Sequence, residues 1–282
     1  MIKRILVPLD PSPYTKSAIE LGCLIAKKND AELTGLVVLD TPGISNASGP
    51  SSIGGGYYAK ELKTIRKKDA EERIHQLLTE FKQKCEKEGV ACNNAEFQGS
   101  PSKEIIRQSI YYDLVMIGIR TFFHFETHDT PGDTLTKILD HAITPIYAVP
   151  ESISIPKHSE EEQIKVLIAF DGSLLAARAL QKFAQLAFSR KFEVIIITSN
   201  KDETIAKYHL EQANSYLQSH GITNVKTVHT NKNIISVIDK DYLNWADYFV
   251  VGAHAKVGII DFMVGSLTKH LIKIDKKPVL IG

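Results

Sequence analysis

The feature of this sequence that most restricts its fold is an internal duplication. Three segments occur twice, in the same order: 2–10 and 164–171, 113–118 and 247–252, 144–149 and 277–281. Asp10 and Asp171, which end the first pair, lie 161 positions apart, whereas Gly118 and Gly252 lie 134 apart. The second copy is therefore about 27 residues shorter in its middle. Matches in a constant order predict one structural unit that is present twice.

The duplication predicts a domain at 1–150, a polar linker at 151–163 and a second domain at 164–282. In both copies, short apolar runs alternate with amphipathic helical patterns, as in α/β folds. We expect two tandem domains, each a five-stranded parallel sheet of the Rossmann type with helices on both faces. The longest predicted helix, 59–88, ends at Gly89 and points Leu62, Ile65, Phe81 and Cys85 inward.

Composition narrows the class of protein. The chain of 282 residues is 43% hydrophobic and 24% charged, which is typical of globular proteins. Its net charge of +1 lacks the basic excess of nucleic-acid-binding proteins. No apolar run approaches the ~18 residues of a membrane span, and no signal peptide is visible. Three cysteines are too few for a disulfide framework. We expect a cytoplasmic protein that binds neither nucleic acid nor membrane.

The stretch 247–269 carries the main functional pattern. A buried strand is predicted to end at Gly252, and a helix to begin near Gly265 and Ser266, with Ser266 as its N-cap. Unpaired amides at a helix start, next to a glycine-containing loop, can bind a phosphate or another anion. The alternative is a plain connection whose glycines serve only the turn.

Other candidate residues carry weaker patterns. His124 and His128 have the i, i+4 spacing of metal ligands on a helix, but they could equally belong to a polar loop. His254 could contact a phosphate or face solvent, and Cys23 and Cys85 are expected in the core. Phosphate-loop, dinucleotide-binding and nucleophile-elbow motifs are absent, and no catalytic residue is assigned.

Both copies resemble the universal stress protein family, and the chain is similar to its tandem two-domain members. Family members that bind ATP carry glycine, two residues, glycine, nine residues, glycine, then serine or threonine. Gly252, Ala255, Gly265 and Ser266 have this spacing, with alanine replacing the second glycine. The first copy departs further, since Gly132 comes one residue late and Asp133 follows it. A carboxylate there would occupy the helix amides and repel phosphate.

The resemblance implies a fold like that of the adenine nucleotide alpha hydrolases. It also implies an adenine nucleotide site, for ATP, ADP or AMP with Mg²⁺ as an optional companion, in the second domain. In the family the aspartate after the first strand lies near the adenine, and Asp171 matches it. The residues expected to form the site are Ala169, Phe170, Asp171, Ser199, Gly252, His254, Ala255, Gly258, Gly265, Ser266 and Leu267.

The resemblance favours a stress-response regulatory protein in which a bound nucleotide alters a surface that an unknown protein partner reads. One alternative is a nucleotide-independent interaction protein whose site has decayed, and another is a slow ATPase. We expect the two copies to pack along their last strands as an intrachain pseudo-dimer. Pairing of two chains into a homodimer stays open.

Overall fold

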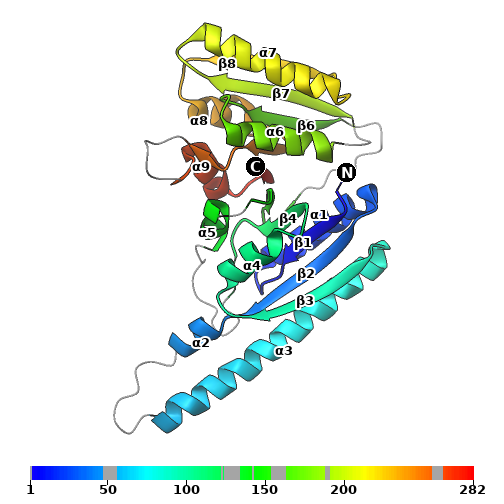
Figure 1. The fold of residues 1–282 in the computed structure, drawn as a ribbon, viewed down its shortest axis with the longest axis vertical. Helices are drawn as coiled ribbons and strands as arrows, with labels where there is room; N and C mark the ends of the chain where they lie inside the picture. The colour runs from blue at the N-terminus through cyan, green and yellow to red at the C-terminus, as the bar shows by residue number, and fades with distance from the viewer. Residues whose placement is uncertain are drawn as a thin grey trace. The chain divides into compact units, whose positions relative to one another are not determined.

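The structure is a computed structural model that describes residues 2–46, 56–121, 123, 134–141, 143–153, 163–187, 191–255 and 263–282. Its contacts divide the chain into two compact units (Figure 1). The N-terminal unit is Lys3–Thr144, and the C-terminal unit is essentially Pro145–Gly282. Each unit is an α/β structure built around parallel strands.

The N-terminal unit contains a parallel sheet in the order β3-β2-β1-β4. Helices α1 and α3 contact each other and pack on one face. Helices α4 and α5 pack together, and right-handed crossovers place them on the opposite face. The elements are β1 (Arg4–Pro8), α1 (Pro13–Asn29), β2 (Glu32–Leu39), α2 (Thr41–Asn46), α3 (Gly56–Glu88), β3 (Cys92–Gln98), α4 (Pro101–Ser109), β4 (Leu114–Gly118) and α5 (Thr134–His141).

The C-terminal unit has the strand order β5-β12-β9-β6-β7-β8. Helices α6 and α7 cover one face and α8 and α9 the other. The elements are β5 (Ile146–Val149), β6 (Ile164–Ala169), α6 (Leu174–Leu186), β7 (Phe192–Ser199), α7 (Glu203–Ser219), β8 (Val225–Thr230), α8 (Ile234–Val237), the π-helix η1 (Ile238–Tyr242), β9 (Tyr248–Val251), β10 (His254–Ala255), β11 (Met263–Val264), α9 (Ser266–Ile274) and β12 (Val279–Ile281).

The predicted tandem α/β fold is confirmed. The last strand of the first copy, β5, pairs antiparallel with β12, the last strand of the second copy. All other strand pairs of the C-terminal sheet are parallel. Within that sheet, β8-β7-β6-β9-β12 repeats the order of the N-terminal strands and continues it by one.

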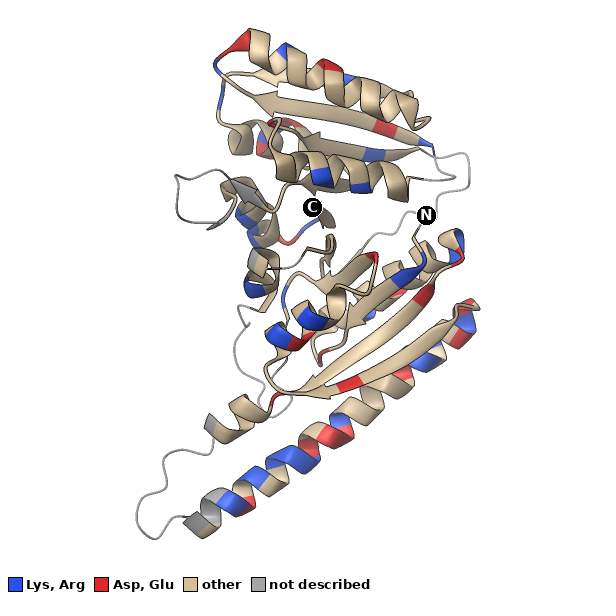
Figure 2. Cartoon of the chain, viewed as in Figure 1, with Lys and Arg blue, Asp and Glu red and all other residues tan. Residues whose placement is uncertain are grey.

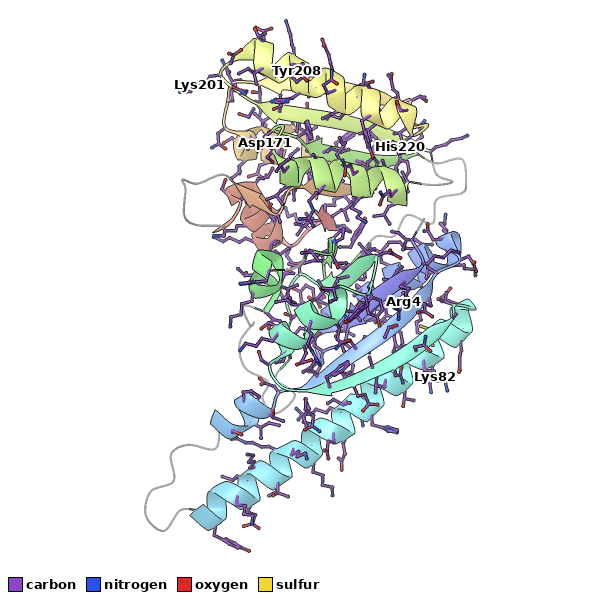
Figure 3. The ribbon with its side chains drawn as sticks, viewed as in Figure 1. Arg4, Lys82, Asp171, Lys201, Tyr208 and His220 are labelled. Carbon is purple, nitrogen blue, oxygen red and sulfur yellow. The ribbon has the colours of Figure 1, made fainter. Side chains whose placement is uncertain are left out.

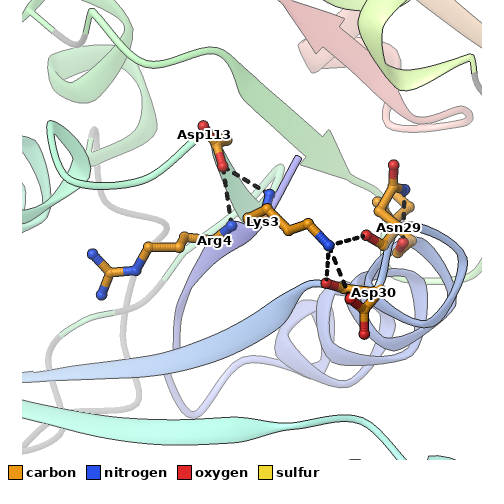
Figure 4. A network of polar contacts seen from close by, with 6 residues as sticks. Lys3, Arg4, Asn29, Asp30 and Asp113 are labelled. Atoms are coloured by element: carbon orange, nitrogen blue, oxygen red, sulfur yellow. Dashed lines mark hydrogen bonds and ion pairs between the residues drawn. The ribbon is translucent and has the colours of Figure 1, made fainter. Parts of the chain in front are cut away.

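The duplication is also visible in one hydrogen-bonding arrangement. Asp113 accepts hydrogen bonds from the backbone N–H groups of Lys3 and Arg4 at 2.8 and 3.0 Å, and its own N–H donates to the Arg4 carbonyl (Figure 4). In the second copy Asp247 accepts from the Lys165 N–H at 2.8 Å and donates back to the Lys165 carbonyl. The aspartate before the fourth strand thus ties that strand to the first in both units.

Two predictions about helices need correction. Leu62 and Ile65 were predicted to point inward but are 46% and 50% exposed. They lie in the first part of α3, which extends past the sheet, and charged residues of both signs follow one another along this helix (Figure 2). Farther along, Phe81 and Cys85 are fully buried as predicted. The sequence of 234–243 also predicts a single α-helix, whereas the structure has a short α8 followed by the π-helix η1.

Candidate functional site

A cavity of about 270 Å³ lies in the C-terminal unit, where the carboxyl ends of β6, β7 and β9 meet the starts of α6, α8 and α9. This is where open parallel sheets bind ligands. Eight of the predicted site residues line it: Ala169, Phe170, Asp171, Ser199, Gly252, Gly265, Ser266 and Leu267. Seven further residues complete the lining: Ser173, Ala176, Ile197, Thr198, Ile234, Val251 and Thr268. The structure therefore gathers most of the predicted set around one space.

Asp171 is held at the end of β6 by a tight turn (Figure 3). Its Oδ1 accepts a hydrogen bond from the Ser173 N–H at 2.9 Å, and the side chain is exposed. Gly172 between them has φ +76°, and a Cβ there would lie within 2.6 Å of the His209 ring. Ser173 is the N-cap of α6 and accepts from the Ala176 N–H. The turn thus presents an exposed carboxylate among the residues that line the cavity.

Gly252 brings the end of β9 directly against the first turn of α6. A Cβ at Gly252 would lie 2.8 Å from the backbone nitrogen of Ala176 and 3.0 Å from the carbonyl carbon of Leu175. The Gly252 carbonyl accepts a hydrogen bond from the buried Thr268 hydroxyl at 2.9 Å. The contact with α6 requires close backbone approach, so this glycine has a packing role that the sequence pattern alone does not reveal.

The start of α9 forms the wall that could bind an anion. The predicted N-cap is wrong by one residue, because the cap position is Gly265 and Ser266 is the first helical residue. The Gly265 N–H donates to the Ala253 carbonyl at 3.2 Å, so this amide is already engaged. The amides of Ser266, Leu267 and Thr268 come next and have no carbonyl four residues earlier within the helix. These three groups supply the positive end of the helix dipole at the cavity.

The remainder of the lining is mainly apolar. Phe170, Ile197, Ile234 and Val251 offer carbon surface against which a flat ring could pack. No lysine or arginine is among the described residues that line the cavity. Sequence reasoning missed Ile234, because its place at the start of α8 depends on how the helix packs across the sheet end.

Three of the predicted site residues are not among the described residues that line the cavity. His254 and Ala255 form β10, which pairs antiparallel with Val264 and Met263 of β11. Gly258 lies outside the described residues, as do the metal candidates His124 and His128. In the part of the chain that the structure describes, no group of three or more His, Cys, Asp or Glu side chains is arranged to hold a metal ion.

The corresponding edge of the N-terminal unit is built differently. Asp10, the counterpart of Asp171, is only 1% exposed and accepts hydrogen bonds from the hydroxyls of Ser12 at 2.6 Å and Thr15 at 2.5 Å. Asp40, directly after β2, is also buried and accepts from the Gly43 N–H. Two buried carboxylates at the ends of β1 and β2 make this edge unfavourable for a phosphate.

Comparison with known proteins gives this architecture a family. A model of the universal stress protein family matches residues 1–150, which is more than half of the chain. The chain belongs to the universal stress protein family. The resemblance inferred from the glycine spacing is thereby confirmed for the family as a whole. No curated protein matches the sequence.

Two solved structures match this chain over both of its copies. A universal stress protein from Archaeoglobus fulgidus is 18% identical with a TM-score of 0.68, covering 99% of this chain and 97% of its own. A functionally unknown protein from Pseudomonas aeruginosa is 17% identical with a TM-score of 0.60, covering 99% of this chain and 92% of its own. These likenesses concern the fold, and they include both tandem copies.

One further match is a universal stress protein family protein from Arabidopsis thaliana with AMP bound. It is 18% identical with a TM-score of 0.34, and covers 52% of this chain and 90% of its own. Over the described ranges of the present chain, no helix combines the length and apolar character that crossing a membrane requires.

Proposed function

We propose that this protein binds an adenine nucleotide in the cavity of its C-terminal unit and acts as a nucleotide-responsive regulatory protein. The observation that carries the proposal is that apolar side chains and the first turn of α9 line the same cavity. A base would pack against Phe170, Ile197 and Ile234. The phosphate would accept hydrogen bonds from the amides of Ser266 and Leu267.

The size and charge of the cavity favour a mononucleotide over a larger cofactor. Its volume of about 270 Å³ is close to the lower end of the ~300–1,000 Å³ typical of small-molecule pockets. Because only helix amides and no basic side chain among the described lining residues face the phosphate, we expect modest affinity. Asp171 at the rim would accept a hydrogen bond from an amino or hydroxyl group of the ligand, and the resemblance assigns this role to the adenine contact.

The proposal excludes the N-terminal unit from nucleotide binding. Its counterpart carboxylate, Asp10, is buried and hydrogen-bonded to Ser12 and Thr15, so a ligand would have to displace these contacts. We propose no catalytic residue, and hydrolysis is not needed for the regulatory role. The antiparallel β5–β12 pair supports the idea that the two copies associate within one chain along their last strands.

Isothermal titration of the full chain with AMP, ADP and ATP tests the proposal. Adenosine and inorganic phosphate serve as partial ligands that report separately on the apolar pocket and on the helix start. We expect AMP to bind more tightly than either part alone. Absence of binding of all three nucleotides at millimolar concentration would refute the proposal and favour the nucleotide-independent interaction protein.

A further inference from the structure

All three cysteines of the chain lie together in the N-terminal unit. Cys23 lies on α1, Cys85 on α3 and Cys92 at the start of β3. The sulfur atoms of Cys23 and Cys85 are 4.0 Å apart. Cys92 follows α3 by a short turn, and its thiol is among the groups that raise the pKa of Cys85. Cys23 and Cys85 are 62 positions apart in the sequence, so the tertiary fold brings these thiols together.

The three thiols differ in how solvent reaches them. Cys92 is half-buried and lies on the edge strand of its sheet. Cys85 is fully buried, and Cys23 is 2% exposed. The cluster therefore runs from the surface at Cys92, through Cys85 in the middle, to Cys23 in the core between α1 and α3.

The two buried thiols also differ in acidity. The hydrogen bond with Cys85 lowers the pKa of the Cys23 thiol, and the Lys84 ammonium acts in the same direction. That same hydrogen bond, together with burial, raises the pKa of Cys85. Because the thiolate is the attacking form in thiol–disulfide exchange, Cys23 is suited to attack a sulfur bond at its neighbour.

We propose that Cys92, Cys85 and Cys23 form a modification site that hydroperoxides oxidise stepwise to a Cys23–Cys85 disulfide. The Cys92 thiolate first attacks the peroxide, so that an S–O bond forms, the O–O bond breaks and hydroxide leaves. Cys85 then attacks the Cys92 sulfenic acid, an S–S bond forms, and the departing hydroxide takes the Cys85 proton as water.

The last step moves the bond inward. Cys23 attacks the Cys85 sulfur, the Cys85–Cys92 bond breaks, and Cys92 leaves as a thiolate that takes up the proton given by Cys23. In total two thiols and one molecule of hydrogen peroxide give one disulfide and two molecules of water. To bond, the two sulfur atoms close from 4.0 Å to the ~2.05 Å of a disulfide, and the product cross-links α1 to α3.

Peptide mapping of the intact chain tests this directly. After hydrogen peroxide treatment, free thiols are alkylated and the protein is digested with trypsin, which places each cysteine on its own peptide: 17–27, 85–87 and 88–103. We expect peptide 17–27 joined to 85–87, with the loss of two hydrogens in mass, and Cys92 alkylated. Recovery of Cys23 and Cys85 both alkylated, or oxidation confined to a sulfonic acid at Cys92, would overturn the proposal.

Three serine variants test the order of the steps. Cys23→Ser should stop the relay at a Cys85–Cys92 disulfide, and Cys92→Ser should slow formation of the Cys23–Cys85 bond. Cys85→Ser, the matched control, should form no disulfide within the chain. A Cys92→Ser protein that oxidises at the unmodified rate, or a Cys23→Ser protein without the Cys85–Cys92 linkage, would contradict the relay. Peptide mapping of the unmodified chain tests the proposal without these variants, so it still applies if a variant folds poorly.

Discussion

A carboxylate at the start of α9 should separate folding stability from nucleotide binding. Ser266 is the first residue of this helix, it is exposed, and it lines the cavity. In the first copy an aspartate, Asp133, follows the corresponding glycine. We therefore expect Ser266→Asp to give the second site the charge that we regard as unfavourable in the first.

The same negative charge has opposite effects on the two properties. In the first turn of a helix, a negative charge interacts favourably with the helix dipole, so the free energy of unfolding should rise by ~0.3–1 kcal/mol. Against a phosphate oxygen about 4 Å away, the repulsion is ~1 kcal/mol in water and ~4 kcal/mol at an effective dielectric constant of ~20. Because Ser266 is exposed, the lower part of this range applies. A loss of ~1–2 kcal/mol corresponds to roughly 5- to 30-fold weaker AMP binding.

Titration calorimetry with AMP at low and high salt, and urea unfolding, measure the two effects on the same samples. The matched control is Ser266→Asn, because asparagine has nearly the same shape as aspartate but carries no charge. We expect Ser266→Asn to bind AMP like the unmodified protein, and the deficit of Ser266→Asp to shrink at high salt. If Ser266→Asp binds AMP as tightly as Ser266→Asn at low salt, the phosphate is not bound at this helix start.

Three further predictions follow from the packing of the two units. Gly252→Ala should lower the free energy of unfolding, measured in urea, by ~1–3 kcal/mol and weaken AMP binding, because the new methyl group would lie 2.8 Å from the backbone nitrogen of Ala176. The counterpart in the first copy, Gly118→Ala, should lower the free energy of unfolding by a similar amount and leave AMP binding unchanged. Ala176→Thr should weaken AMP binding in the same titration, since the new hydroxyl can bond to the carboxylate five residues earlier; unchanged affinity would contradict this. Burial raises the pKa of Tyr147 and Tyr248, so both ionise in the unfolded chain near pH ~10 but not in the folded one. Their contribution to stability is full below that pH and is lost above it, which urea unfolding at rising pH, with Tyr147→Phe as a less sensitive control, would detect.

The strands and their order of alternation with helices could be predicted because apolar runs buried on both faces are unambiguous. The inward face of α3 was predicted correctly at Phe81 and wrongly at Leu62 and Ile65. Helical periodicity tells which residues share a face, but not where the sheet beneath them ends. The position of the sheet edge is a tertiary fact, and no pattern within 59–88 reveals it.

The parts of the candidate site that are formed by the backbone could be predicted from the sequence. The carboxyl ends of strands, the glycines and the start of α9 follow from the sequence, with an error of one residue at Ser266. The apolar lining from Ile234 and the hydroxyl of Thr268 on Gly252 do not, because they come from elements that meet only in the folded chain. Sequence spacing also left open whether Gly252 serves a phosphate or only the turn, and the structure adds a close packing contact with α6 that the spacing did not reveal.

One difference between the two copies, the burial of the aspartate after the first strand, can be traced to one position. Asp10 and Asp171 occupy the same place after the first strand, and the residues five positions later are Thr15 and Ala176. The Thr15 hydroxyl donates to Asp10 and also accepts from its backbone N–H, which draws the carboxylate into the core. Alanine cannot make these bonds, so Asp171 remains exposed at the rim and Ala176 itself lines the open cavity. After duplication, one copy could thus use its aspartate to close the end of the sheet while the other kept that end free for a ligand.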